Sequence, residues 1–225
     1  MAPFYNYLIR SSAFAIVGFI ALIFIPAWRL NYWQGWAYIA TFAAAGFAYT
    51  AYFLRHDPAL VKRRTEGGVS HEKEPAQKVI IVSLYIVSIA LVVMSSLDVR
   101  FGWSNVPREV SLIGDALTAV SFYIFYMVSK VNTYAAASVR VELDQRVIST
   151  GVYNLVRHPM YFGVLILVIG TPLALASWWA LLLVPFFFVI LYFRIVNEER
   201  VLARDLPGYV EYRQKIRYRL IPLVW

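Results

Sequence analysis

The sequence predicts an all-α integral membrane protein with about six transmembrane helices and a C-terminal amphipathic helix at the membrane surface. Of its 225 residues, 60% are hydrophobic and only 15% are charged, whereas about a quarter of the residues in soluble domains are charged. Six long apolar stretches approach the ~20 residues that a helix needs to cross the hydrocarbon core. Lys and Arg gather on one side of these stretches, as is typical of cytoplasmic loops.

The apolar stretches follow one another with short or polar connections, and they span residues 11–28, 36–54, 79–97, 110–128, 161–176 and 178–195. The last two form a tight hairpin. The fifth is short for a span, which predicts tilt or local thinning of the bilayer. Pro172 and Pro185 lie inside the last two stretches, where we expect them to bend the helices.

The basic residues predict the orientation in the membrane. With a cytoplasmic N-terminus, six spans return the C-terminus to the cytoplasm, and only Arg29, Arg100 and Arg108 of the 21 Lys and Arg fall in outer loops. This distribution follows the positive-inside rule. We therefore expect a multi-pass protein with both termini in the cytoplasm, in the cell (inner) membrane rather than an organelle. The net charge of +8 is then explained by contacts with anionic membrane lipids, without nucleic acid.

We expect a single membrane domain over residues 1–225, with a four-helix N-terminal part (1–130) and a part that carries the candidate site (131–225). The inner loop 55–78 has mixed charge and is expected to be partly helical at the head groups. Residues 139–143 alternate apolar and polar side chains, which favours a short extended excursion or hairpin. Beyond Glu199, apolar and basic residues alternate as in an amphipathic helix that breaks near Pro207 and Gly208.

Several kinds of site are excluded or disfavoured by the residue types present. The chain has no cysteine, so disulfides, thiolate metal ligands and cysteine nucleophiles are excluded. His56 and His71 lack partners at ligand spacing, and no metal site is expected. No Gly-x-Gly-x-x-Gly follows a strand-like segment, which argues against a Rossmann-type cofactor site.

Two polar clusters lie at the two ends of the last hairpin. The first, residues 150–163, precedes the fifth stretch and contains Arg157 and His158, and Pro159 fits the first turn of the next helix. The second contains Arg194 and Glu198, one helical turn apart. Because the two stretches are antiparallel, both clusters should meet at the inner membrane face. Two structural interpretations also stay open: an interfacial anchor, and a salt-bridge cluster that pins the hairpin.

Carboxylates and cations converging at the membrane edge match a zwitterionic, partly cationic ligand such as S-adenosylmethionine. His158 or Arg157 is suited to its α-carboxylate, and Glu198 to its ammonium and ribose hydroxyls. The sulfonium favours aromatic faces such as those of Tyr153 or Tyr161. Glu199 is rotated by about 100° from Glu198 on a helix, and the sequence leaves open which of the two faces the ligand.

The C-terminal region, residues 130–225, resembles the isoprenylcysteine carboxyl methyltransferase family, membrane enzymes related to the phospholipid N-methyltransferases. The first half of the chain is similar to the family only in being hydrophobic and helical. The resemblance rests on Gly151-x-Tyr153, Arg157-His158-Pro159-x-Tyr161, Glu198-Glu199-x-x-Leu202, and a Tyr209-x-x-Tyr212 tail that ends in Pro222.

The resemblance implies an S-adenosylmethionine-dependent methyltransferase that acts on a lipophilic or lipid-modified small acceptor, with carboxyl O-methylation of an isoprenylcysteine-like substrate as the leading expectation. It further implies that Arg194 contacts the acceptor and that Arg194 and Glu198 are the catalytic residues. With the groups considered above, the candidate cofactor-binding residues are Gln145, Arg146, Val147, Ile148, Tyr153, Arg157, His158, Pro159, Met160, Tyr161, Glu198 and Glu199.

Three alternatives stay open. Phospholipid N-methylation fits because Glu198 or Glu199 could take a proton from an amine. An NADPH-dependent reductase of the steroid 5-alpha-reductase type has a similar Arg-His-Pro-x-Tyr turn, but that family usually has Asn where this chain has Met160. A non-catalytic membrane scaffold would use the polar cluster for structure alone.

Overall fold

The computed structural model describes residues 2–65, 67–69, 72, 74–135, 141 and 145–225, and all regular structure in this part of the chain is helical. This confirms the all-α class. Five helical segments are long and apolar enough to cross a membrane. They are α1 (Ala2–Ala27), α2 (Trp33–His56), α4 (Pro75–Phe101), α5 (Arg108–Val131), and the continuous run of η3 (Trp179–Leu183) and α7 (Val184–Asp205).

Helix α6 (Pro159–Ala174) is the short fifth stretch that the sequence predicts. Its 16 residues rise only ~24 Å, less than the ~30 Å of a typical hydrocarbon core. Three further elements are shorter: α3 (Pro58–Thr65), the 3₁₀ turn η2 (Gly151–Asn154) and α8 (Tyr209–Lys215). Helix α3 confirms that the inner loop is partly helical.

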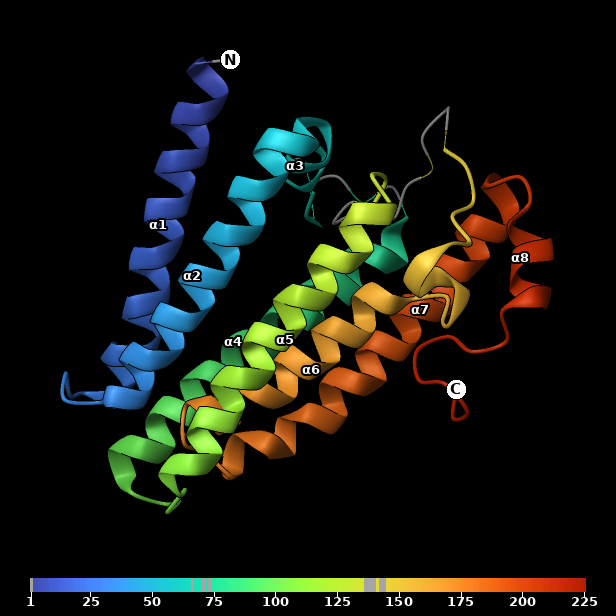
Figure 1. The fold of residues 1–225 in the computed structure, drawn as a ribbon. Helices are drawn as coiled ribbons and strands as arrows, with labels where there is room; N and C mark the ends of the chain where they lie inside the picture. The colour runs from blue at the N-terminus through green and yellow to red at the C-terminus, as the bar shows by residue number, and fades with distance from the viewer. Residues whose placement is uncertain (1, 66, 70–71, 73, 136–140, 142–144) are drawn as a thin grey trace.

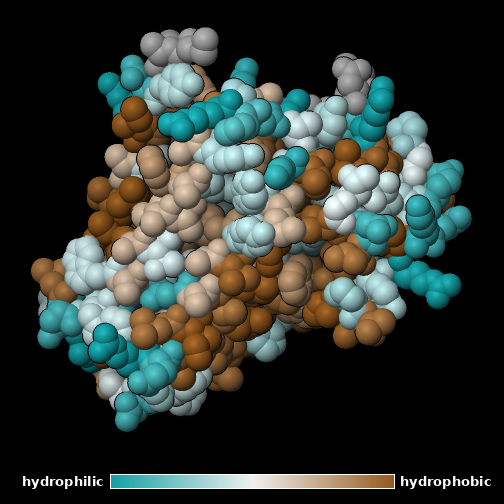
Figure 2. Space-filling model, viewed as in Figure 1, coloured by the Kyte–Doolittle hydropathy of each residue, from teal (hydrophilic) through white to brown (hydrophobic). Residues whose placement is uncertain are grey.

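The long helices run side by side, with α1 and α2 flanking the group formed by α4, α5, α6 and α7 (Figure 1). The connections α1–α2, α4–α5 and α6–η3 lie at one end of the molecule. The N-terminus, α3, η2 and α8 lie at the other end (Figure 1). Hydrophobic residues cover much of the middle of the face seen in Figure 2, and hydrophilic residues gather towards its two ends. This is the surface expected of a helical bundle in a bilayer.

Small residues bring α5 and α6 into close contact along their length. A Cβ added to Gly114 of α5 would overlap the main chain of Ala174, and one added to Gly163 of α6 would lie 2.7 Å from a ring carbon of Phe125. In a membrane, where apolar burial does not drive helix association, such close van der Waals packing holds helices together. It fixes the start of α6 beside the end of α5, where the candidate site lies.

The opposite end of the bundle is held by a buried carboxylate. Asp98 of α4 accepts hydrogen bonds from the Ser104 amide (2.7 Å) and from the Ser177 hydroxyl (2.5 Å). It thereby joins the α4–α5 connection to the turn between α6 and η3. Both helices of the last hairpin are therefore anchored at the end far from the site as well as at the end near it.

Several expectations about helix bounds need correction. Helix α1 begins at Ala2, about nine residues before the apolar stretch. Pro185 is in the first turn of α7 rather than inside it, because η3 precedes it, and a first-turn proline leaves no helical hydrogen bond missing. The break expected near Pro207 and Gly208 is confirmed: α7 ends at Asp205, Gly208 has φ 82°, and the seven residues of α8 follow. The expected excursion at residues 139–143 falls, apart from one residue, outside the described residues.

Candidate functional site

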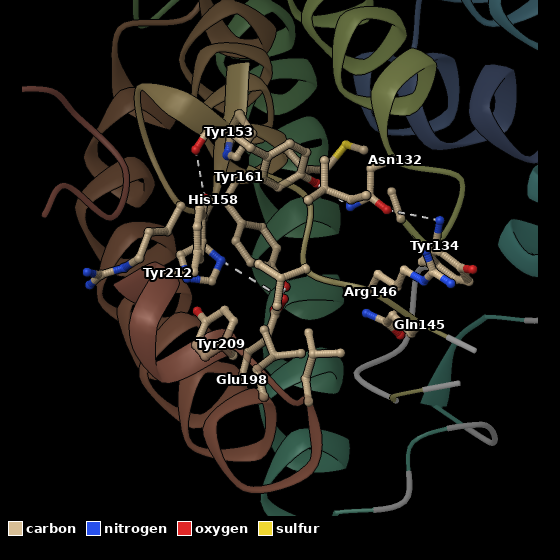
Figure 3. Close-up of a pocket in the computed structure, with 18 residues that line it drawn as sticks. Asn132, Tyr134, Gln145, Arg146, Tyr153, His158, Tyr161, Glu198, Tyr209 and Tyr212 are labelled. Carbon is tan, nitrogen blue, oxygen red and sulfur yellow. Dashed lines mark hydrogen bonds and ion pairs between the residues drawn. The ribbon is translucent and has the colours of Figure 1, made fainter. Parts of the chain in front are cut away.

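A cavity opens at the α3 and α8 end of the bundle, between the end of α5, residues 145–148, η2, the start of α6, the end of α7, and α8 (Figure 3). Together with its open mouth it encloses about 880 Å³ of empty space.

Most of the candidate cofactor-binding residues line this cavity. Those that do are Gln145, Arg146, Val147, Ile148, Tyr153, Arg157, His158, Pro159, Met160, Tyr161 and Glu198. Arg194 and Glu199 are not among the residues that line it. The structure therefore brings together two segments about 40 residues apart in the chain, and of the two adjacent glutamates it turns Glu198 towards the cavity.

Seven further residues line the cavity, and none of them was predicted as a site residue: Asn132, Tyr134, Ala135, Leu202, Leu206, Tyr209 and Tyr212. Leu202, Tyr209 and Tyr212 belong to the motifs that carry the family resemblance, so their spacing was the available signal. Asn132 to Ala135 follow the end of α5 and carry no motif. Only the packing of α5 against α6 brings them to the site.

His158 and Glu198 meet at the centre of the cavity wall, as expected from the hairpin. His158 Nδ1 lies 3.9 Å from Glu198 Oε1, and the Tyr161 hydroxyl donates to Glu198 Oε2 at 2.5 Å. The rings of His158 and Tyr161 stack with centroids 5.8 Å apart. The Glu198 side chain is 21% exposed, so its carboxylate is fixed by the protein and still open to a ligand.

Glu199 is the centre of a buried ion cluster behind the cavity wall. Its Oε1 accepts a hydrogen bond from Arg157 Nε at 2.7 Å and lies 3.2 Å from His158 Nε2, and its Oε2 accepts one from Arg219 Nε at 2.9 Å. Arg157 also donates to the main-chain oxygen of Ile216 at 2.9 Å. These bonds tie the segment before α6 to the chain after α8, which gives Arg157 and Glu199 a structural role in the described chain.

The same tie continues through the main chain. The amides of Arg157 and His158 donate to the carbonyl oxygens of Tyr218 (2.9 Å) and Arg219 (2.8 Å). His158 is also the residue that precedes Pro159 at the start of α6. The C-terminal segment thus holds the main chain at His158, and the contacts of the ring with Glu199 and Tyr161 orient the side chain.

Arg194 lies one turn before Glu198 on α7, but its guanidinium is held by residues near the start of α4. Its Nη1 is 2.6 Å from Glu72 Oε1 and 2.5 Å from Gln77 Oε1. Both ion-pair partners are buried, with side chains 5% and 0% exposed. Arg194 Nε reaches the Tyr161 hydroxyl at 3.3 Å, so its contact with the cavity runs through Tyr161.

Tyrosines form much of the remaining wall (Figure 3). Asn132 Nδ2 donates to the Tyr153 hydroxyl at 2.7 Å, and the Tyr212 hydroxyl donates to the Tyr153 carbonyl oxygen at 2.8 Å. Burial raises the pKa of Tyr153 to about 12 and also raises the pKa of Tyr209 and of Tyr212. These phenols are therefore neutral at physiological pH.

The lining has the chemistry of a nucleoside-like ligand that carries a cation. One wall is apolar and is formed by Val147, Leu202 and Leu206, which suits an aromatic base. The rest of the lining offers the Glu198 carboxylate and tyrosine faces, which suit ribose hydroxyls, an ammonium and a sulfonium. S-adenosylmethionine fits this donor set. Within the described ranges, no three or more His, Asp or Glu side chains are grouped so as to hold a metal ion.

Comparison with known proteins agrees with this chemistry. A search of curated proteins gives no match. Residues 110–206 match the family model described as phospholipid methyltransferase. The matched segment begins in α5 and ends just after α7, and it includes His158, Tyr161, Arg194 and Glu198. The resemblance to the membrane methyltransferases is thereby confirmed over residues 110–206, where the chain is similar to the phospholipid methyltransferases.

Proposed function

We propose that this protein is an S-adenosylmethionine-dependent methyltransferase that acts at the membrane on a lipophilic acceptor. The observation that supports this most strongly is the cavity at which the ends of the last hairpin meet, with His158 and Glu198 3.9 Å apart on its wall. The match to phospholipid methyltransferases covers these residues.

When bound, S-adenosylmethionine supplies an electrophilic methyl group on a sulfonium. The protein mainly has to hold donor and acceptor in line, and positioning alone can lower a barrier by several kcal/mol. In our proposal, Glu198 binds the ribose hydroxyls or the ammonium, and the hydroxyl of Tyr161 holds that carboxylate in place. The faces of Tyr153 and Tyr161 stabilise the positive charge, and His158 and the main chain of residues 145–148 complete the cofactor site.

The charges around Arg194 favour an amine over a carboxylate as the acceptor group. Arg194 would orient an acceptor carboxylate, but its cation is already paired with Glu72 at 2.6 Å. A carboxylate acceptor would have to displace Glu72, whereas an amine acceptor leaves the pair intact. The carboxylate at Glu198 is suited to accept the proton that a lipid ammonium must lose before its nitrogen forms the new N–C bond.

Carboxyl O-methylation of an isoprenylcysteine-like substrate is the second candidate. It is favoured by the contact between Arg194 and Tyr161 (3.3 Å), because that contact links the cation to the cavity wall. An acceptor carboxylate needs no general base, and in this case Glu198 would serve only the cofactor.

The test is a methyl-transfer assay with the purified protein, a donor labelled in its methyl group, and either total membrane lipids or prenylated peptides. For an amine acceptor we expect label in the lipid extract that resists mild base. For a carboxyl acceptor we expect base to release the label as methanol. If no methyl group is transferred and the protein oxidises NADPH instead, the protein is a reductase and the proposal is wrong. If the protein neither transfers a methyl group nor oxidises NADPH, the result favours a membrane scaffold.

The variant Glu72→Gln separates the two acceptor classes. If the acceptor is a carboxylate, removing the competing charge frees Arg194 and lowers the KM for the acceptor. If the acceptor is an amine, the KM for the acceptor does not fall. The KM for S-adenosylmethionine is the control, and we expect it to stay unchanged because Arg194 and Glu72 are not among the residues that line the cavity.

A further inference from the structure

Tyr209, the first residue of α8, lines the cavity and has a buried hydroxyl without a partner. The residue is only 4% exposed, and within the described part of the chain its hydroxyl has no hydrogen-bond partner. Figure 3 shows its side chain pointing from α8 towards the group formed by His158, Tyr161 and Glu198. Tyr209 has no role in the proposed function as described above.

Three other tyrosines of this wall, Tyr153, Tyr161 and Tyr212, differ from Tyr209 in this respect. The hydroxyl of Tyr153 accepts a hydrogen bond from Asn132, that of Tyr161 donates to Glu198, and that of Tyr212 donates to the Tyr153 carbonyl oxygen. Native structures rarely leave a buried hydroxyl unpaired, because it has lost its hydrogen bonds to water and gained none in return. A phenylalanine would fill the same space without this cost, so the hydroxyl requires an explanation.

The protonation state of Tyr209 indicates what its partner must be. Burial raises the pKa of Tyr209, and the nearby carboxylates of Glu199 and Glu198 raise it further. The phenol is thus neutral and carries a proton to donate. Neither carboxylate accepts this proton, because the hydroxyl has no hydrogen-bond partner among the described residues, so the partner that it lacks is an acceptor atom.

We propose that the Tyr209 hydroxyl donates a hydrogen bond to an acceptor atom of S-adenosylmethionine, which makes Tyr209 a cofactor-binding residue of the tail. The inference rests on the proposed function and adds α8 to the cofactor site, outside the segment that matches the phospholipid methyltransferase model. Two parts of the cofactor offer such an atom: the α-carboxylate of the amino-acid half and the ring nitrogens or ribose oxygens of the nucleoside half.

The test compares Tyr209→Phe with Tyr212→Phe. Without cofactor, the melting temperature of Tyr209→Phe should equal or exceed that of the wild type, because the removed hydroxyl has no partner. The Tyr212→Phe variant should melt lower, because the Tyr153 carbonyl oxygen loses its donor. In calorimetric titrations, Tyr209→Phe should bind S-adenosylhomocysteine about tenfold more weakly, as expected for the loss of one buried hydrogen bond.

A second ligand, decarboxylated S-adenosylmethionine, locates the acceptor atom. If Tyr209 contacts the carboxylate, wild type and Tyr209→Phe should bind this ligand equally. If Tyr209 contacts the nucleoside half, the tenfold ratio should persist.

Two results would overturn the inference while leaving the proposed function intact: equal affinity of wild type and Tyr209→Phe for S-adenosylhomocysteine, or a free Tyr209→Phe protein that melts as low as Tyr212→Phe. A wild-type protein that binds no S-adenosylhomocysteine would overturn the proposed function, and this inference with it.

Discussion

At the scale of single residues, the adjacent glutamates of α7 have opposite environments. Glu198 faces the cavity with its side chain 21% exposed, whereas the side chain of Glu199 is 4% exposed and meets Arg157 and Arg219. Their rotation by about 100° around the helix produces this difference. One carboxylate is therefore available to a ligand, and the other holds the C-terminal segment against the start of α6.

The variants Glu198→Gln and Glu199→Gln test this division of roles, and each serves as the control for the other. Glu199→Gln leaves the buried cation of Arg157 unbalanced and should lower the free energy of unfolding by about 3 kcal/mol, measured by thermal or denaturant unfolding in detergent. Glu198→Gln should change stability little and should weaken binding of S-adenosylhomocysteine at least tenfold. Equal losses of stability for both variants would contradict the assignment.

Residues of the site were predictable from the sequence only where they belong to a recognisable motif or where helical spacing brings them to the same end of the hairpin. The spacing of the hairpin placed His158 near Glu198. The motifs singled out Tyr153 and residues 157–161, and residues 145–148 were assigned by their spacing from the family's motif alone. The partners of Arg194 were not predictable. Glu72 and Gln77 reach it across more than 100 residues of chain, and no periodic pattern indicates which polar residue at the start of one helix will meet the end of another.

At the scale of elements, the contact between α5 and α6 positions the site. Its close approach depends on positions without a side chain, above all Gly114, where a Cβ would overlap the main chain of Ala174. Because α6 begins with residues of the site and Asn132 directly follows α5, separation of these helices would pull the two sides of the cavity apart.

The variant Gly114→Ala should therefore lower both the stability of the protein and its affinity for the cofactor, although it adds only one methyl group. Overpacking of this kind costs about 1–3 kcal/mol, and we expect a lower melting temperature in detergent together with weaker binding of S-adenosylhomocysteine. The control is Gly18→Ala in α1, where nothing lies within 4 Å of the added Cβ and stability should change by less than about 1 kcal/mol. The prediction would be wrong if the two variants behaved alike.

The elements themselves were largely predictable, but their ends were not. Apolar runs of about 20 residues identify the long helices because a span must satisfy its backbone hydrogen bonds internally. Polar residues can extend a helix into the interface at no such cost, so hydropathy missed the first turns of α1 and the last turns of α7. Helix α8 ends at Lys215, and the chain beyond it pairs with the main chain of residues 157–158, a pairing that has no signature in local sequence.

At the scale of the whole molecule, the arrangement of the helices brings the N-terminus, α3 and α8 to one end (Figure 1). The distribution of Lys and Arg predicts that this end faces the cytoplasm. A cavity at this end would then draw its nucleoside cofactor from the cytoplasm and its acceptor from the surrounding lipid.

The natural absence of cysteine makes this orientation straightforward to measure. Single cysteines can replace the exposed residues Asn31 and Asn105 at one end, and the exposed residues Lys62 and Gln214 at the other. In intact cells, a membrane-impermeant maleimide should label Asn31→Cys and Asn105→Cys only, and all four variants should react after the membrane is opened. Labelling of Gln214→Cys in intact cells would show that the protein has the opposite topology.

We propose above that the cavity between the last hairpin and the tail holds S-adenosylmethionine. The most direct measurement is an experimentally determined structure of the protein with S-adenosylhomocysteine bound. We expect the ligand to lie in the cavity beside His158, within hydrogen-bonding distance of the Glu198 carboxylate and with its base against Val147, Leu202 and Leu206. A ligand bound elsewhere on the protein, with this cavity empty, would contradict it.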